Sequence, residues 1–224
     1  MKKTVALAVA SALGLSVFAL GDVLMDQIGA ADGSNLDGSI GASQIFEDSF
    51  AGYSIAAIDD FTLDGDYNID SVAFVLNGWN GYAGSAAVIE YTVNIYSSIE
   101  AAGASLTGDV YSSTGSASGD GGWTGSGELM SMLTDGLTLG AGTYLLSVTP
   151  RNDFGSNGQT GIMTSDLGNA NGYQANPNGG FGFGPYQQTG SNYAYGMSGS
   201  LVPAPGALAL LGLAGLAGTR RRRG

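Results

Sequence analysis

Oxygen-bearing side chains occupy alternate positions in one short segment, as they do in a calcium-binding loop. The four candidate calcium ligands are Asp64, Asp66, Asn68 and Asp70. The segment departs from the helix–loop–helix calcium motif, because Ile69 stands where that motif needs glycine and Val75 where it needs glutamate. A polar hairpin turn between two strands explains these residues better, with weak calcium binding as the alternative. The same two interpretations apply to residues 32–38.

The absence of histidine and cysteine limits the catalytic chemistry of this chain. It excludes thiol and Ser-His-Asp catalysis and removes the commonest protein ligand of zinc, copper and iron. Catalysis would then depend on carboxylates. Asp59 and Asp60 are neighbours on a predicted strand, so they point to opposite faces and cannot act as a pair. We expect one of them to be partly buried and hydrogen-bonded to loop amides.

Glu90 and Glu128 are further acidic candidates, of the kind that a glycoside hydrolase pairs across a sugar. Nothing in the sequence selects such a pair among 19 acidic residues. We therefore expect no enzyme, and keep a carboxylate-dependent polysaccharide hydrolase as the alternative.

Aromatic residues near glycine and asparagine indicate a second kind of site. Trp79, Tyr82 and Trp123 lie in predicted loops, beside amide side chains able to hydrogen-bond hydroxyl groups. Such rings would stack on a sugar face, which makes these three residues candidates for glycan contact. The structural alternative, which we favour, is that they and the aromatic residues of 171–195 close the ends of a sandwich.

Basic residues gather at the two ends of the chain. Residues 22–201 contain all 19 acidic residues but only Arg151 of the seven basic ones, a formal net charge of −18. A nucleic-acid backbone requires a basic surface, so we expect no nucleic-acid partner. The charge favours solubility and repulsion between copies.

The first 21 residues have the parts of a secretory signal peptide. Lys2 and Lys3 precede an uncharged apolar core, and small residues stand before Asp22 at the spacing that signal peptidase cleaves. We expect removal of this segment during export.

The last 23 residues, 202–224, also have three parts. Val202-Pro203-Ala204-Pro205 is followed by the apolar segment 206–218 and by an arginine cluster, Arg220, Arg221, Arg222 and Arg223. A helix over 206–218 would rise only about 20 Å, against a hydrocarbon core of about 30 Å, so spanning is marginal. Arginines after such a segment stay on the cytoplasmic side and leave the body outside.

This order of parts resembles the PEP-CTERM sorting signal of bacterial exosortase substrates. The resemblance rests on Val202, Pro203, Pro205 and the arginine cluster, and departs from the family where Ala204 replaces the usual glutamate. It implies recognition by an exosortase-like membrane protease, cleavage near the prolines, and release or attachment at the cell surface. The body also resembles the all-β ectodomains that precede such tails, through residues 58–62 and 193–200.

Alternating apolar residues between turn signals predict strands throughout the body. We predict them at 23–28, 55–63, 72–76, 91–96, 110–113, 128–133, 144–148 and 193–201, with one helical turn at 98–104. This pattern predicts an all-β fold, an antiparallel β-sandwich of jelly-roll type. The chain then divides into a signal peptide (1–21), an acidic β-sandwich ectodomain (22–201) and a PEP-CTERM-like sorting signal (202–224). A signal helix and a short C-terminal hydrophobic helix would flank the sandwich.

Together these features predict an exported bacterial protein of the cell surface or extracellular matrix, with a structural or adhesive role. The expected partners are signal peptidase, an exosortase-like membrane protease and extracellular polysaccharide. The C-terminal segment would enter the membrane transiently or permanently. We expect no cofactor, apart from the calcium considered above, and a calcium-dependent binding module is a further alternative.

Overall fold

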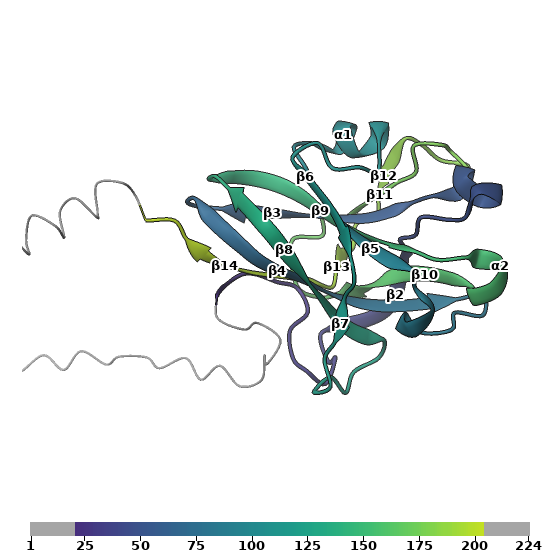
Figure 1. Cartoon of the computed structure of the whole chain (residues 1–224), viewed down its shortest axis with the longest axis horizontal. Coiled ribbons are helices and arrows are strands. Elements are labelled where there is room, and N and C mark those ends of the chain that lie inside the picture. The colour runs from purple at the N-terminus through teal and green to yellow at the C-terminus, as the bar shows by residue number, and fades with distance from the viewer. Residues whose placement is uncertain (1–20, 204–224) are drawn as a thin grey trace, which may run out of the picture.

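The computed structural model describes residues 21–203. These residues form two antiparallel β-sheets packed face to face, with four short helices at the margins (Figure 1). The predicted all-β sandwich is therefore confirmed. The predicted signal helix and C-terminal hydrophobic helix lie outside the described residues. No helix within 21–203 has the length and apolar character needed to cross a membrane.

The first sheet has eight strands. They are β1 (Asp22–Asp26), β2 (Leu36–Ala42), β4 (Tyr67–Trp79), β7 (Ser118–Gly119), β8 (Glu128–Leu139), β10 (Gln159–Ser165), β13 (Asn192–Tyr193) and β14 (Tyr195–Leu201). The long strand β4 is its centre, because it pairs with β14, β10 and β8.

The second sheet has six strands in the order β12-β11-β3-β9-β5-β6. They are β3 (Ala56–Leu63), β5 (Glu90–Tyr96), β6 (Tyr111–Gly115), β9 (Gly142–Arg151), β11 (Tyr173–Ala175) and β12 (Tyr186–Gln188). The helices are η1 (Asp48–Tyr53), η2 (Ser85–Ala87), α1 (Ile99–Ala104) and α2 (Phe154–Asn157).

The core lies between the sheets, where alternate residues of the long strands meet. Phe74 and Leu76 of β4 face Val93 of β5 and Val148 of β9, and all four are fully buried. Each such side chain contributes about 1.5–3 kcal/mol by leaving water. The hydroxyl of Tyr195, also fully buried, crosses this core to the backbone of the second sheet. Period-2 patterning thus places the apolar face of each sheet inward.

The predicted strands all occur, and the predicted helical turn is α1, capped by the Ser98 side chain. The strand predicted at 128–133 continues to Leu139 past a bulge. Sequence patterns missed β2, which contains two glycines, and β10, which is buried along its whole length and shows no alternation. They also missed the three-residue strands β11 and β12.

The hairpin predicted at residues 64–70 is wrong. Strand β3 ends at Leu63 and β4 begins at Tyr67, but the two strands belong to different sheets. The connection is an arch that carries the chain from one sheet to the other. It lies at the end of the sandwich where β14 ends. There the Val202 N–H donates to the Asp66 carbonyl at 2.8 Å.

Candidate ligand pocket

The three candidate glycan-contact residues do not form one platform. Trp79 is the last residue of β4, not a loop residue, and packs against a buried cluster that includes Phe46. Trp123 packs against a separate cluster that includes Met163, and its indole N–H donates to the Ser126 carbonyl at 3.3 Å. Tyr82 packs on the main core. Their surroundings fit the structural interpretation.

The predicted glycosidase-type acids have structural partners. Glu128 accepts hydrogen bonds from the Tyr82 hydroxyl at 2.9 Å, from the Ser85 N–H at 2.8 Å and from the Ser85 hydroxyl. Burial, together with the bond to Glu128, raises the pKa of Tyr82 far above its ordinary value. Glu90 lies 3.9 Å from the Arg151 guanidinium in a solvated pair, of the kind that contributes little to stability.

Asp59 and Asp60 point away from each other, as the strand predicts. Asp59 is fully buried and accepts the backbone N–H of Tyr193 at 2.6 Å and of Asp60 at 2.9 Å. Asp60 is half-buried, and its two carboxylate oxygens each accept from the Asn169 amide at 3.0 Å. The predicted amide-bonded aspartate is therefore Asp59, but it is fully and not partly buried, and its donors belong to strands and not to loops.

The candidate calcium ligands are spread along the arch and the start of β4. Asp64 accepts from the Tyr67 hydroxyl at 2.9 Å, and the Asn68 amide oxygen accepts from the Thr138 hydroxyl at 2.7 Å. Among the described residues, no group of three or more acidic side chains is placed to hold a metal ion. Calcium binding stays a prediction, and a shift of the melting temperature on calcium titration would test it.

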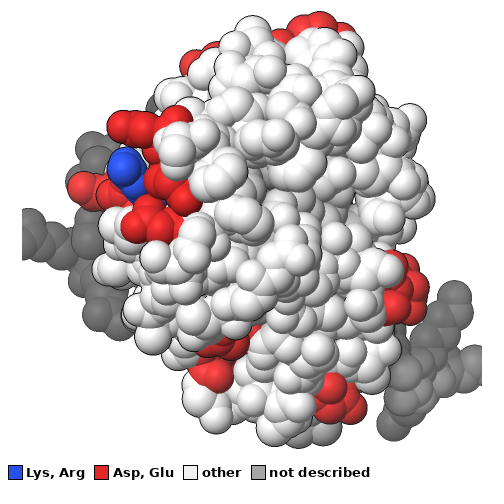
Figure 2. Space-filling model, turned by 90° about the vertical axis from the view of Figure 1, so that its right-hand side faces the viewer, with Lys and Arg blue, Asp and Glu red and all other residues white. Residues whose placement is uncertain are grey.

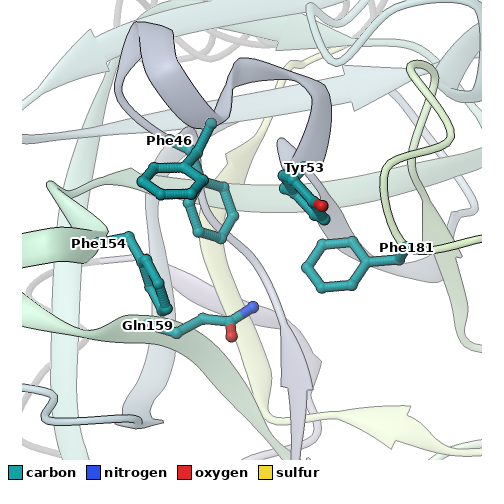
Figure 3. Close-up of a pocket in the computed structure, with 6 residues that line it drawn as sticks. Phe46, Tyr53, Phe154, Gln159 and Phe181 are labelled. Atoms are coloured by element: carbon teal, nitrogen blue, oxygen red, sulfur yellow. The ribbon is translucent and has the colours of Figure 1, made fainter.

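A different feature offers a candidate binding site: a pocket lined by five aromatic rings. Phe46, Phe50, Tyr53, Phe154 and Phe181 surround a cavity of about 280 Å³, and Gln159 also lines it (Figure 3). The rings come from three segments: the 43–54 loop with η1, the turn at α2, and the glycine-rich 176–185 loop. Figure 1 places α2 at the end of the sandwich opposite the exit of β14.

The aromatic rings contact one another around the cavity. Phe50 meets Phe154 edge-on at 5.5 Å between centroids, and Tyr53 meets Phe181 edge-on at 5.4 Å. Phe46 is 6% exposed and lies 5.9 Å from Phe154 and 6.4 Å from Phe181. Phe50, Tyr53 and Phe181 are 36%, 43% and 39% exposed. The pocket thus has a buried floor and an open aromatic rim.

Buried amide side chains hold the walls of the pocket together. Gln44 accepts from the Thr160 N–H at 2.6 Å and donates to the Asn152 carbonyl at 3.1 Å, which joins the 43–54 loop to β10 and to the end of β9. Asn152 donates to the Gly158 carbonyl at 3.0 Å and so closes the α2 turn. The side chains of Gln44 and Asn152 are both fully buried, and of their polar atoms only the Asn152 side-chain oxygen lacks a hydrogen-bond partner.

Asn176 fixes the third wall. Its side-chain N–H₂ donates to the Ser54 carbonyl at 2.8 Å, while its oxygen accepts from the Phe181 N–H at 3.1 Å. The Gly180 N–H also donates to the Gly52 carbonyl at 3.0 Å. The Phe181 ring is therefore held against the η1 segment although its loop lacks regular structure.

Gln159 supplies a buried polar group to the pocket. It is 5% exposed, and its side-chain nitrogen is buried without a hydrogen-bond partner. Figure 3 shows its carboxamide directed into the space between the rings. Buried polar groups are nearly always paired in folded proteins, so we expect this donor to bond a water molecule or a ligand atom.

The pocket lies in a negative electrostatic environment. Glu47 accepts the N–H groups of Phe154 at 2.8 Å and Gly155 at 3.3 Å. Desolvation acts to raise its pKa, but these amide bonds outweigh it and leave the pKa below its ordinary value. Glu47 is therefore ionised at neutral pH. In Figure 2, which looks onto this end of the molecule, a single basic group is surrounded by acidic ones, and Arg151 is the only basic residue within 21–203.

No protein-family model, curated protein or solved structure matches this chain. The interpretation of the pocket therefore depends on its own geometry.

Sequence reasoning missed this pocket because its rings are distant in the chain. Phe46, Phe50 and Tyr53 precede β3, whereas Phe154 and Phe181 follow β9 and β11. A weak signal did exist: three aromatic residues within 46–53 without strand alternation. The unpaired state of Gln159 leaves no trace in the sequence.

Proposed function

We propose that this protein is an exported surface or matrix protein with a structural or adhesive role, and that the aromatic pocket is its contact site. The signal peptide and sorting signal in the sequence support export and processing by signal peptidase and an exosortase-like protease. The observation that carries the adhesive role is the position of the pocket. Helix α2, whose Phe154 lines the pocket, lies at one end of the sandwich, whereas β14 ends at the other (Figure 1).

This placement of the pocket and of the end of β14 at opposite ends suits a domain that is anchored or sorted through its C-terminal segment. Strand β14 ends at Leu201, where Val202 is bonded to the arch between β3 and β4. A membrane or surface attachment at residues 202–224 would leave η1 and α2 facing outward. Three of the five rings would then form an exposed apolar rim, and such rims often mark interaction sites.

We also propose that the sandwich is of jelly-roll type. Successive segments alternate between the sheets, since β3 is in the second, β4 in the first, β5 in the second, β8 in the first and β9 in the second. Crossing connections of this kind are what a jelly roll contains. They also bring both loop-rich ends of the sandwich to the surface, where binding residues commonly lie.

We propose a non-catalytic role. The carboxylates that the sequence offered for a hydrolase, Glu90 and Glu128, have partners in Arg151 and Ser85. The aromatic pocket has no carboxylate among its lining residues. Extracellular polysaccharide remains a proposed partner of the exported protein, although Trp79, Tyr82 and Trp123 provide no common platform for it.

Retention on the producing cell tests this proposal. The full chain would be compared with a Phe50→Ser/Phe181→Ser variant and with Leu133→Ser, a control that changes an exposed apolar residue remote in the chain from the pocket. We expect export of all three, with lower retention on cells and matrix for the double variant alone. Equal retention of all three, with folding verified, would contradict the adhesive role of the pocket.

A further inference from the structure

We propose that the aromatic pocket binds a choline-type ligand, a trimethylammonium group that carries an oxygen atom two carbons away. This inference names the ligand class for the contact site of the proposed function. Binding itself does not require export, so the two proposals can fail separately.

The ring arrangement favours an alkylated cation. Aromatic faces carry negative charge density and attract quaternary ammonium groups, whose methyl groups also bury apolar surface against the rings. The five rings leave about 280 Å³ of space, enough for a trimethylammonium group with a short substituent. The edge-on pairs Phe50–Phe154 and Tyr53–Phe181 both belong to the lining of that space.

The surrounding charge also favours a cation. Glu47 is anchored beside Phe154, and Asp48 and Asp153 are neighbours of lining segments in the chain. The only basic residue within 21–203, Arg151, pairs with Glu90. With a body charge of −18, the field repels anions. We therefore expect phosphocholine, which adds a phosphate, to bind less well than choline.

The unpaired amide of Gln159 explains why the ligand needs an oxygen. Its buried nitrogen is a hydrogen-bond donor without an acceptor, and the Gln159 side chain lines the same cavity as the rings, with its carboxamide directed into that space (Figure 3). The hydroxyl or ester oxygen of a choline-type ligand would accept this bond while the ammonium group contacts the rings. Tetramethylammonium, which has no oxygen, would leave the donor unpaired.

A matched pair of ligands tests the role of charge. Choline and 3,3-dimethylbutan-1-ol have nearly the same shape, but the second is neutral. The purified full-length chain would be titrated with each ligand in non-ionic detergent, and binding followed by NMR or calorimetry. Choline should bind at least about tenfold more tightly than dimethylbutanol, because cation–π contacts at a desolvated site provide that much discrimination. Equal binding of the two ligands, or no binding of choline, would overturn the proposal.

Variants test the assigned groups. We expect Gln159→Leu to lower choline affinity about tenfold and to leave tetramethylammonium affinity unchanged, because only choline loses a hydrogen bond. Gln159→Met serves the same purpose if the first variant is unstable. Phe50→Leu should weaken choline more than dimethylbutanol, while Leu133→Ala should change neither. A Gln159 variant that weakens both cations equally would overturn the role of the amide.

Phosphocholine and retention on cells separate the remaining outcomes. Tighter binding of phosphocholine than of choline would contradict the field argument. Choline binding by a protein that stays in the cytosol would support this inference and overturn the proposed function. A protein that is retained on cells, is not released by choline and does not bind choline in vitro would support the proposed function and overturn this inference.

Discussion

The Asp59 carboxylate accepts the backbone N–H of Tyr193 at 2.6 Å and so joins β3 of the second sheet to β13 of the first. Its other oxygen accepts from the Asp60 N–H at 2.9 Å. When the Gln27 side-chain amide is oriented with its nitrogen toward Asp59, this nitrogen is a third donor, at 2.9 Å from the Asp59 carboxylate. Burial raises the pKa of Asp59 to about 7, although the bonds from Tyr193 and Asp60 act in the opposite direction.

This pKa predicts that the protein loses stability as the pH rises toward neutrality. The unfolded chain releases the Asp59 proton near pH 3.8, whereas the folded chain holds it to about pH 7. The folded state therefore binds more protons between these values, and the free energy of unfolding falls across that window. Carboxylates with lowered pKa values, such as Glu47, change the free energy of unfolding mainly at lower pH.

Urea unfolding at pH 5, 6 and 7 measures this dependence. In Asp59→Asn the side chain does not titrate, so this part of the slope should disappear. The variant should also be less stable at pH 5, where Asp59 is neutral, because its amide N–H₂ would face the Tyr193 or Asp60 donor, and this difference should shrink toward pH 7. A slope unchanged by the substitution would show that Asp59 is not the titrating group.

Removal of the Tyr195 hydroxyl should destabilise the sandwich. This hydroxyl donates to the Ala57 carbonyl at 2.9 Å and accepts the Val148 N–H at 3.1 Å, deep between the sheets. Tyr195→Phe would leave both backbone groups without this partner, at a cost of about 1–3 kcal/mol in the free energy of unfolding. Chemical denaturation gives the value. A loss below a few tenths of a kcal/mol would mean that water or backbone movement replaces the hydroxyl.

The amide network predicts that Asn176 controls the pocket without lining it. Asn176→Ala removes the bonds to Ser54 and Phe181, so the 176–185 loop should loosen and choline affinity should fall about threefold to tenfold. Asn178→Ala is the matched control, because Asn178 is exposed and makes one bond, to the Ala51 carbonyl at 3.3 Å. Hydrogen exchange at the Phe181 amide reports the loosening directly. Equal protection in both variants would contradict this role.

Much of the fold could be predicted from the sequence because long strands of a sandwich alternate. In β5 and β9, apolar residues at every second position face the core, and this spacing is local information. Strand β10 gives no such signal. All seven of its residues are buried, and polar ones such as Thr160 are satisfied by distant partners like Gln44. The hairpin predicted at 64–70 was wrong because turn residues do not show which sheet the next strand joins.

The pocket was beyond prediction for a related reason. Each aromatic residue had a structural explanation of its own, and only the folded arrangement brings Phe46 beside Phe154 and Phe181. Conversely, Trp79 and Trp123 looked similar in sequence but pack in separate clusters. Composition identified the chemistry available, but long-range pairing decided where it was assembled.

Intact mass spectrometry of the protein recovered from the surface of the producing cell tests the central claim most directly. The account predicts a chain that begins at Asp22 and has lost Arg220–Arg223, plus any attached group. A protein of all 224 residues, found in the cytosol, would contradict it.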